Sequence, residues 1–307
     1  MFPLIAIAGP TGSGKTALAL FLARQFDAEI VNCDSLQLYR GFNIGTAKTP
    51  PDKRQGVPHH LFDVLSAESG YSAGEYSRVA REVLAEISSR GRLPLLVGGT
   101  GFYLRSLLVG LPSLPPKNES LRRRLAEREL HRPGSLHKIL SRLDPECAVR
   151  IHANDTQKLI RAVELRLLTL APRPTSESAT PLIGYRILTI GLDPEPIQLR
   201  ERLESRTREM FAAGLLDEVR GLLAHGLSGD EKPFEALGYR QALQVLRGAC
   251  TIEQAIESTI TATRQYAKRQ RTWFRRDPSI QWVRSFGEQA VACNFATALI
   301  EDWLAKS

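Results

Sequence analysis

PLIAIAGPTGSGKTALALFLARQF, residues 3–26, joins an apolar run to an amphipathic segment through a glycine-rich loop. The apolar run 3–8 predicts a buried strand, and the apolar positions of 15–26 fall on one side of a helix. The intervening GPTGSGKT, residues 9–16, lets backbone N–H groups turn toward an anion, and the helix adds the positive end of its dipole. This order predicts an α/β protein of the P-loop NTPase-like type.

The loop matches the pattern G-x-x-x-x-G-K-[ST]. Its lysine supplies a point charge, and the hydroxyl of Thr16 is a ligand for Mg²⁺. We therefore predict a site for a phosphorylated ligand, with Mg²⁺ as cofactor. The predicted phosphate-binding residues are Gly9, Pro10, Thr11, Gly12, Ser13, Gly14, Lys15 and Thr16. The loop alone does not specify the reaction.

Strands and helices alternate beyond the loop. Further strands are predicted at 28–35, 92–101 and 186–193, with a short edge segment at 59–66. Ser72 and Glu75 form a capping-box pattern that begins a helix, and Gly91 ends it. The alternation predicts a parallel sheet flanked by helices.

The alternation stops at the proline-rich PSLPPK. A helical pattern at 154–170 is followed by APRPTSESATP, a loop or hinge rich in Pro, Ser and Thr. We predict an all-helical insertion domain at 115–181. Residues 1–114 and 182–307 would form the P-loop core, with helices from its last strand to the end of the chain.

Composition limits the compartment and the partners. The 307 residues carry a formal net charge of +8, and the pI of about 9.5 favours a polyanionic partner. The four cysteines have no metal-ligand spacing, which favours a reducing, cytoplasmic location. The apolar N-terminus without a basic region predicts a core strand rather than a signal peptide, and no run approaches the roughly 18 apolar residues of a membrane span.

An acidic residue at the end of a core strand helps to hold Mg²⁺ in ordinary P-loop ATPases. The strand LPLLVGGTG ends in Gly98, Gly99 and Thr100, without a carboxylate. The strand 28–35 instead carries Asp34 near its end. If that strand lies beside 3–8, Asp34 comes close to the phosphate loop, where it could assist Mg²⁺, orient a nucleophile or accept its proton. Asp34 could also be an ordinary cap or turn residue.

Residues 251–278 predict one long helix that ends at Pro278. Its expected core face comprises Ile252, Ile256, Ile260 and Thr263. A basic stripe follows at i, i+4, i+7 and i+11, formed by Arg264, Lys268, Arg271 and Arg275. Six cations and no acids occur in 264–276, which favours contact with phosphates. GYRQ, residues 238–241, could stack on a base or bond its edge, or could be a turn that begins a helix.

Eight ordered segments together resemble the tRNA dimethylallyltransferase (tRNA isopentenyltransferase) family, in its bacterial type. They are GPTGSGKT (9–16), DSLQLYRGFNIGTAK (34–48), HHLFDV (59–64), GGTGFYLRSL (98–107), NDTQKLIRAVEL (154–165), RLESRTREMFAAGLLDEV (202–219), ALGYRQAL (236–243) and TRQYAKRQRTWFR (263–275). The family loop often has Ala where this chain has Gly12. The resemblance covers nearly the whole chain.

The resemblance implies transfer of a dimethylallyl group from dimethylallyl diphosphate to N6 of the adenosine just 3′ of the anticodon. The expected partners are dimethylallyl diphosphate and the anticodon stem-loop of tRNA, and we expect a monomer. The implied catalytic residues are Asp34, Thr100, Lys15 and Arg206. The implied tRNA-binding residues are Asp34, Ser35, Leu36, Gln37, Thr100, Arg122, Lys158, Leu159, Ile160, Arg161, Ala162, Gly238, Tyr239, Arg240, Gln241, Arg264, Gln265, Lys268, Arg269, Arg271 and Arg275.

Three other functions remain open from the residues alone. A prenyltransferase that acts on free adenine nucleotides would not need the basic stripe. An ATP-dependent kinase or NTPase that binds RNA would lack an acid after LPLLVGG. A non-catalytic RNA-binding protein would leave Lys15, Thr16 and Asp34 without a task.

Overall fold

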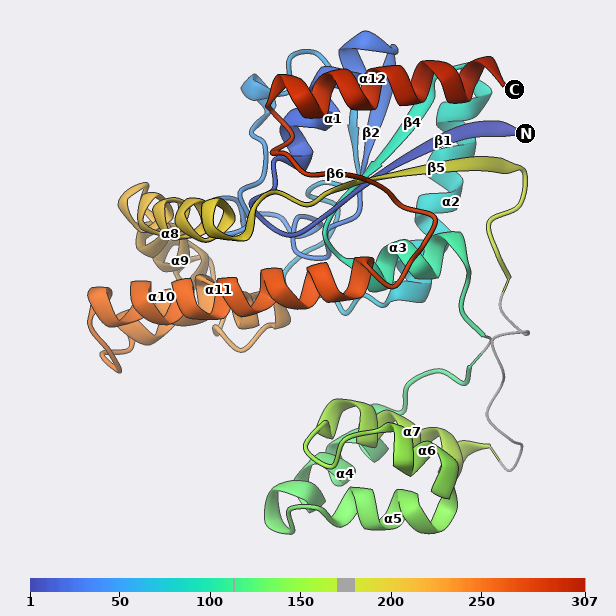
Figure 1. Cartoon of the computed structure of the whole chain (residues 1–307). Helices are drawn as coiled ribbons and strands as arrows, with labels where there is room; N and C mark the ends of the chain where they lie inside the picture. The colour runs from blue at the N-terminus through green and yellow to red at the C-terminus, as the bar shows by residue number, and fades with distance from the viewer. Residues whose placement is uncertain (113, 170–179, 307) are drawn as a thin grey trace. The chain divides into compact units, whose positions relative to one another are not determined.

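The computed structural model describes residues 1–112, 114–169 and 180–306 (Figure 1). Contacts divide the chain into two compact units, of which the first is Met1–Leu108 with Leu182–Ser307 and the second is Val109–Pro181. Each unit has its own apolar core. Among the described residues, no helix combines the length and the apolar character needed to cross a membrane.

The first unit is built on a six-stranded sheet in the order β3-β2-β4-β1-β5-β6, and all of its strand pairs are parallel. The strands are β1 (Phe2–Ala8), β2 (Ala28–Asn32), β3 (His59–His60), β4 (Leu93–Val97), β5 (Tyr185–Leu192) and β6 (Gln281–Val283). Ile5 of β1 lies opposite Leu95 of β4 and Leu188 of β5. β1 is apolar at almost every position because both faces of the sheet are covered. The predicted α/β fold class is confirmed.

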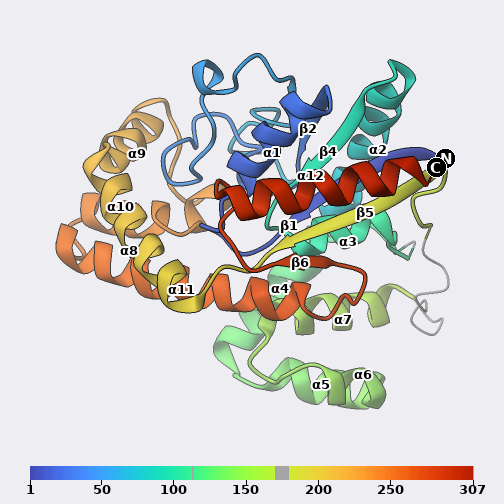
Figure 2. The same ribbon diagram turned by 45° about the horizontal axis from the view of Figure 1, so that its top comes forward.

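Helices lie over the two faces of this sheet and beyond the carboxyl ends of its strands, where α8, α9 and α10 lie (Figure 1). The helices are α1 (Lys15–Gln25), α2 (Ala73–Ser89), α3 (Gly101–Leu108), α8 (Pro196–Ala212), α9 (Leu215–Ala224), α10 (Tyr239–Leu246), α11 (Ile252–Phe274) and α12 (Ala290–Ala305). α1 and α12 lie together on one face, whereas α2 and α3 lie on the other (Figures 1 and 2). The capping box of Ser72 and Glu75 that was predicted for α2 is confirmed.

One prediction about the sheet is wrong, and one condition that the sequence left open is not met. The end of the chain is not wholly helical, because Gln281–Val283 pair with β5 as β6. This three-residue run has too little sequence to show a pattern, and its neighbour determines that it is a strand. β2 is also not beside β1, because β4 lies between them.

The backbones after β2 and β4 nevertheless approach closely. A Cβ added at Gly98 would lie 2.0 Å from the Cys33 carbonyl oxygen, so only glycine fits there. The Thr100 N–H donates to that same oxygen at 3.2 Å. This contact places Asp34 and Thr100, which follow the two strands, side by side.

The second unit consists of α4 (Glu119–His131), α5 (Ser135–Leu143), α6 (Pro145–Arg150) and α7 (Thr156–Leu168). Its core is formed by buried side chains that include Leu136, Leu140 and Leu159. The helix predicted at 154–170 is α7, capped by Asp155. Most of the predicted loop at 171–181 lies outside the described residues.

Candidate functional site

The loop between β1 and α1 has the geometry of an anion-binding site. Gly9 has φ of +144°, and a Cβ there would lie 2.7 Å from the Leu192 carbonyl oxygen. Gly14 caps α1 with φ of +87° and has no side chain to satisfy the first helical N–H groups. Such N–H groups bind anions when no side chain caps them.

Lys15 folds back over this loop. Its Nζ donates to the carbonyl oxygens of Gly9 at 3.0 Å and Pro10 at 2.8 Å. Burial lowers the pKa of Lys15 to about 8, Asp34 opposes this change, and the positive charge of Arg206 adds to it. The ammonium is therefore held by neutral carbonyl groups, and its charge remains available to an anion.

Two hydroxyl groups complete the loop. Ser13 is fully buried, and its Oγ has no hydrogen-bond partner among the described residues. Thr16 is exposed in the first turn of α1. An unpaired hydroxyl inside the loop and an exposed hydroxyl beside it fit a phosphorylated ligand with a metal ion that keeps most of its waters.

Asp34 lies just beyond β2 in a tightly hydrogen-bonded turn. Its N–H donates to Asn32 Oδ1 at 2.8 Å, and Asn32 Nδ2 donates to the Asp34 carbonyl oxygen at 3.0 Å. The Leu36 N–H donates to Asp34 Oδ1 at 3.0 Å. Over the described part of the chain, Oδ2 accepts no hydrogen bond, so one carboxylate oxygen is free for a ligand.

Thr100 lies against the same turn. Its Oγ1 accepts a hydrogen bond from the Ser35 N–H at 3.1 Å. The predicted pair of Asp34 and Thr100 is thus brought together from two adjacent strands, although these residues are far apart in sequence. We call this pair, with the turn 32–36, the acceptor corner.

Arg206 of α8 interacts electrostatically with Asp34 of the acceptor corner. Burial and the positive charge of Arg202 lower the pKa of Arg206, and Asp34 opposes that effect. Arg202 is paired with Glu288, whereas Arg206 has no ion-pair partner in the described ranges. Lys15 and Arg206 together leave an excess of positive charge around one carboxylate.

Asp193 is an acidic residue at a strand end that the sequence analysis overlooked. It follows β5, next to β1, and its carboxylate pairs with Arg271 Nε at 2.6 Å and Arg275 Nη2 at 2.7 Å. Because both carboxylate oxygens face guanidinium groups, Asp193 anchors α11 instead of serving the phosphate loop. The run RILTIGLD at 186–193 contained the signal, a carboxylate that ends a core strand.

The basic stripe of α11 is only partly free. Arg264 pairs with Glu204 at 2.7 Å, and Arg271 and Arg275 pair with Asp193. Lys268 and Arg269 are exposed and form no ion pair within the described residues. These two side chains are thus the members of the predicted RNA-binding set on α11 whose charges are least compensated.

The predicted core face of α11 is wrong in part. Ile252 is 42% exposed, whereas the buried positions include Ala255, Ile260, Ala267 and Phe274. The buried face passes through Ala255 and Ala267 because small side chains allow neighbouring elements to approach closely. Gln265 is exposed.

The predicted segment GYRQ has a mainly structural position. Tyr239 is fully buried, donates its hydroxyl to Glu218 Oε1 at 2.5 Å and accepts from the Gly45 N–H at 3.1 Å. Gln241 is buried and accepts from the Gly238 N–H at 3.0 Å. A Tyr239 ring in this position is covered and does not stack on a base. Arg240 is exposed.

Residues of the loop after Asp34 are also held by hydrogen bonds within the first unit. Gln37 Nε2 donates to the Thr46 carbonyl oxygen at 3.0 Å, and Glu218 accepts from the Asn43 and Ile44 N–H groups. Ser35 and Leu36 contribute backbone N–H groups to the acceptor corner. The loop is therefore fixed by α9 and α10.

In the second unit, the predicted residues divide into charged and apolar groups. Arg122 and Arg161 lie near Glu164, at 3.4 Å and 2.7 Å, and Lys158 pairs with Asp155. The remaining predicted residues are buried in the core of the unit, namely Leu159, Ile160 and Ala162. Their side chains stabilise α7 rather than meet a ligand.

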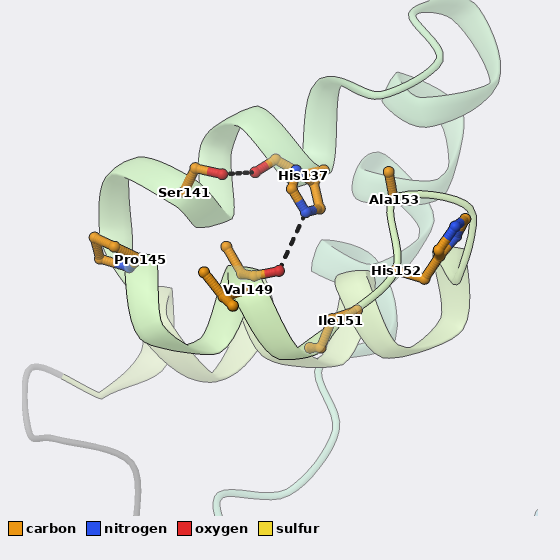
Figure 3. Close-up of a pocket in the computed structure, with 8 residues that line it drawn as sticks. His137, Ser141, Pro145, Val149, Ile151, His152 and Ala153 are labelled. Atoms are coloured by element: carbon orange, nitrogen blue, oxygen red, sulfur yellow. Dashed lines mark hydrogen bonds between the residues drawn. The ribbon is translucent and has the colours of Figure 1, made fainter.

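A pocket of about 500 Å³ also lies in the second unit, over α5 and α6 (Figure 3). Its lining is mostly apolar and includes His137, Val149 and His152. His137 Nε2 lies 3.2 Å from the Ala148 carbonyl oxygen, and Ser141 Oγ donates to the His137 carbonyl oxygen. These polar groups serve the fold of the unit, and none of the predicted site residues lines this pocket.

Comparison with known proteins identifies close relatives. A model of the IPP transferase family matches residues 37–277. The tRNA dimethylallyltransferase of Solibacter usitatus is 54% identical over 289 residues, which cover 93% of this chain and 94% of that protein. The tRNA dimethylallyltransferase of Koribacter versatilis is 50% identical over 302 residues, with coverage of 97% and 98%.

Solved structures give the same result. The tRNA isopentenylpyrophosphate transferase of Bacillus halodurans matches with a TM-score of 0.72 at 34% identity, covering 100% of this chain and 96% of that one. A eukaryotic dimethylallyltransferase acting on tRNA matches with a TM-score of 0.81 at 25% identity, covering 100% and 80%.

The lowered pKa of Lys15 predicts how anion affinity depends on pH. As pH rises through about 8, the free protein loses the Lys15 ammonium. A bound anion raises that pKa, so above pH 8 binding takes up a proton and affinity falls by up to about tenfold per pH unit. Titration calorimetry with inorganic diphosphate between pH 6.5 and 9.5 measures this slope.

The matched control is Lys15→Arg, whose guanidinium stays charged over this range. The titration of diphosphate itself contributes equally to both proteins, so their difference isolates Lys15. Identical pH profiles for the two proteins would show that Lys15 does not titrate near 8 in the site.

Proposed function

The chain belongs to the IPP transferase family of tRNA dimethylallyltransferases, which transfer a prenyl group to a tRNA adenosine, and we propose which of its residues perform each part of that reaction. The phosphate loop binds the diphosphate of dimethylallyl diphosphate. The acceptor corner binds N6 of the adenosine 3′ to the anticodon. The excess of positive charge from Lys15 and Arg206 is the observation that carries this proposal.

The leaving group accounts for that charge. The bond between C1 of the allyl group and the diphosphate oxygen breaks, and both electrons leave with the diphosphate. Positive groups that are already in place stabilise the charge that develops on this oxygen. Lys15, Arg206 and the N–H groups at the start of α1 would perform this task. Among the described residues, neither cation is paired with a carboxylate that would compete with the diphosphate.

Mg²⁺ fits the same position. Thr16 would hold it, with diphosphate oxygens and waters as the other ligands, because Mg²⁺ prefers octahedral oxygen coordination and dehydrates reluctantly. The ion supplies further positive charge to the diphosphate when it is bound. No cluster of three acidic, histidine or cysteine side chains in the described regions offers an alternative metal site.

The acceptor amine is a poor nucleophile, so its orientation matters. Asp34 Oδ2 accepts a hydrogen bond from the N6 amine and directs its lone pair toward C1, and Thr100 Oγ1 lies beside it. As the new C–N bond forms, N6 loses a proton. The position of Asp34 suits it to accept this proton or to hold the amine while water accepts it.

The base must leave its stack to reach this corner. Extrusion costs roughly a few kcal/mol, which contacts between the protein and the RNA backbone offset. Lys268 and Arg269 of α11 and Arg240 of α10 are exposed and supply such contacts. We propose that the enzyme works in the cytoplasm as a monomer, and its free cysteines fit a reducing compartment.

The alternative functions lack comparable support. For an ATPase, the strand-end carboxylate nearest to β1 is Asp193, which is paired with two arginines. For a prenyltransferase that acts on free adenine nucleotides, the exposed Lys268 and Arg269 would have no ligand. The relatives at 54% and 50% identity are named for transfer to tRNA.

Labelled dimethylallyl diphosphate and unmodified tRNA test the proposal directly. We expect label in the tRNA, at the adenosine 3′ to the anticodon, with release of one diphosphate per group transferred. Nucleoside analysis after digestion of the RNA locates the label. Hydrolysis of ATP without labelling of the tRNA would contradict the proposed reaction.

Asp34→Asn separates chemistry from binding. The amide keeps the acceptor for the Leu36 N–H but loses the negative charge, so we expect turnover to fall by about 10²–10³. Affinity for tRNA should stay within about threefold, measured by filter binding. If the variant loses tRNA binding and keeps its turnover at saturating tRNA, Asp34 acts in recognition rather than in chemistry.

Lys268→Glu tests the free part of the basic stripe. We expect weaker tRNA binding and a slope of log affinity against log salt that is smaller by about 1, because one phosphate contact is lost. The control is Lys306→Glu, at an exposed lysine that directly follows α12 and pairs with Asp302. If both changes weaken tRNA binding equally, Lys268 contributes only through the net charge of the protein and makes no specific phosphate contact.

A further inference from the structure

Gln270 of α11 connects two loops of the site. Its Oε1 accepts from the Thr11 N–H at 2.7 Å, and its Nε2 donates to the Gly99 carbonyl oxygen at 2.8 Å. The side chain is 6% exposed. Thr11 belongs to the phosphate loop, and Gly99 immediately precedes Thr100 of the acceptor corner.

The partners determine the orientation of this amide. A backbone N–H only donates and a carbonyl oxygen only accepts, so each end of the Gln270 amide matches a single loop. A Cβ added at Gly99 would lie 2.4 Å from Gln270 Nε2, so the sequence keeps a glycine where the amide approaches. The bridge thus requires both a glutamine at 270 and a glycine at 99.

The same helix also faces the acceptor corner and the solvent. Tyr266, one turn before Gln270, interacts electrostatically with Asp34, and burial together with that charge raises the pKa of Tyr266. Lys268 and Arg269 lie on the exposed side. A shift of α11 would therefore displace the phosphate loop, the acceptor corner and the two exposed cations together.

We propose that Gln270 is a positioning residue that sets the distance between the leaving diphosphate and the acceptor base. The inference rests on the site assigned above. Gln270 touches neither substrate, because the oxygen and nitrogen of its amide are both engaged by backbone groups. It acts by fixing the phosphate loop and the acceptor corner to one rigid helix, the helix that also meets the RNA.

Alignment of this kind affects the chemical step more than binding. A displacement of about 1 Å between reacting groups costs on the order of 10² in rate, while each substrate still has its own contacts. Loss of the bridge should therefore lower the rate of transfer on the enzyme. The affinities for tRNA and for dimethylallyl diphosphate should change little.

Gln270→Met removes both hydrogen bonds and preserves the length of the side chain. We expect the single-turnover rate with excess enzyme to fall at least tenfold, while the dissociation constants of tRNA and dimethylallyl diphosphate stay within about threefold. The matched control is Gln244→Met, an exposed glutamine of α10, which should retain the wild-type rate. Thermal unfolding of each variant shows that the assay temperature leaves it folded.

If Gln270→Met does not fold, Gln270→Glu tests the same proposal. One carboxylate oxygen still accepts from the Thr11 N–H, but the other meets the Gly99 carbonyl oxygen, so the rate should again fall at least tenfold. Affinity for tRNA should again stay within about threefold, which separates a loss of alignment from a loss of the fold.

Three outcomes would overturn the proposal. They are an unchanged rate in both Gln270 variants, an equal loss in Gln244→Met, and a large loss of tRNA affinity with a normal rate at saturation. The wild-type protein in the same assay separates this question from the reaction itself. Absence of transfer by the wild type would refute the proposed function, not the role of Gln270.

Discussion

Uncompensated positive charge around Asp34 is the constraint on which the rest of the site depends. Burial lowers the pKa of both Lys15 and Arg206, and a neighbouring arginine adds to this effect in each case, namely Arg206 for Lys15 and Arg202 for Arg206. A carboxylate paired with either cation would oppose this effect but would also compete with an anionic ligand. The fold instead holds Lys15 with two carbonyl groups and leaves Arg206 without an ion pair in the described residues. An anion of several charges is the ligand that such an arrangement favours.

α11 is held to the core so that this charge stays in place. Asp193 pairs with Arg271 and Arg275 at the carboxyl end of the helix. Glu204 pairs with Arg264, which lies about two turns before Arg271. The strand-end carboxylate that would assist a metal in an ATPase thus fixes a helix here. Three arginines of the stripe serve the fold first, which leaves the exposed Lys268 and Arg269 as the cations most available to RNA.

The sequence predicts the local parts of this site and misses the parts made by distant segments. The phosphate loop is contiguous and Asp34 ends a predicted strand, so the residues themselves point to both, whereas the role of Thr100 comes from the family resemblance. The ion pairs of α11 could not, because an acid-free helix gives no information about carboxylates on α8 or after β5. GYRQ leaves two alternatives open in the sequence, contact with a base or the start of a helix. The structure has the second, because Tyr239 begins α10 and its hydroxyl bonds Glu218 of α9. β6 exists only because β5 pairs with it.

The position of β4 between β1 and β2 differs from the arrangement that would place Asp34 next to the phosphate loop, and the chemistry explains why. In a displacement at carbon, the nucleophile and the leaving group occupy opposite sides of the reacting atom. Two strand spacings amount to roughly 10 Å, which leaves room for the diphosphate, the reacting carbon and the amine in one line. A carboxylate on the adjacent strand would instead lie beside the phosphate loop, where P-loop ATPases use such a group to help hold Mg²⁺. The segment after the intervening strand contributes Gly98, Gly99 and Thr100, and the two glycines leave room for the Cys33 backbone and for Gln270 beside the hydroxyl that we propose meets the amine.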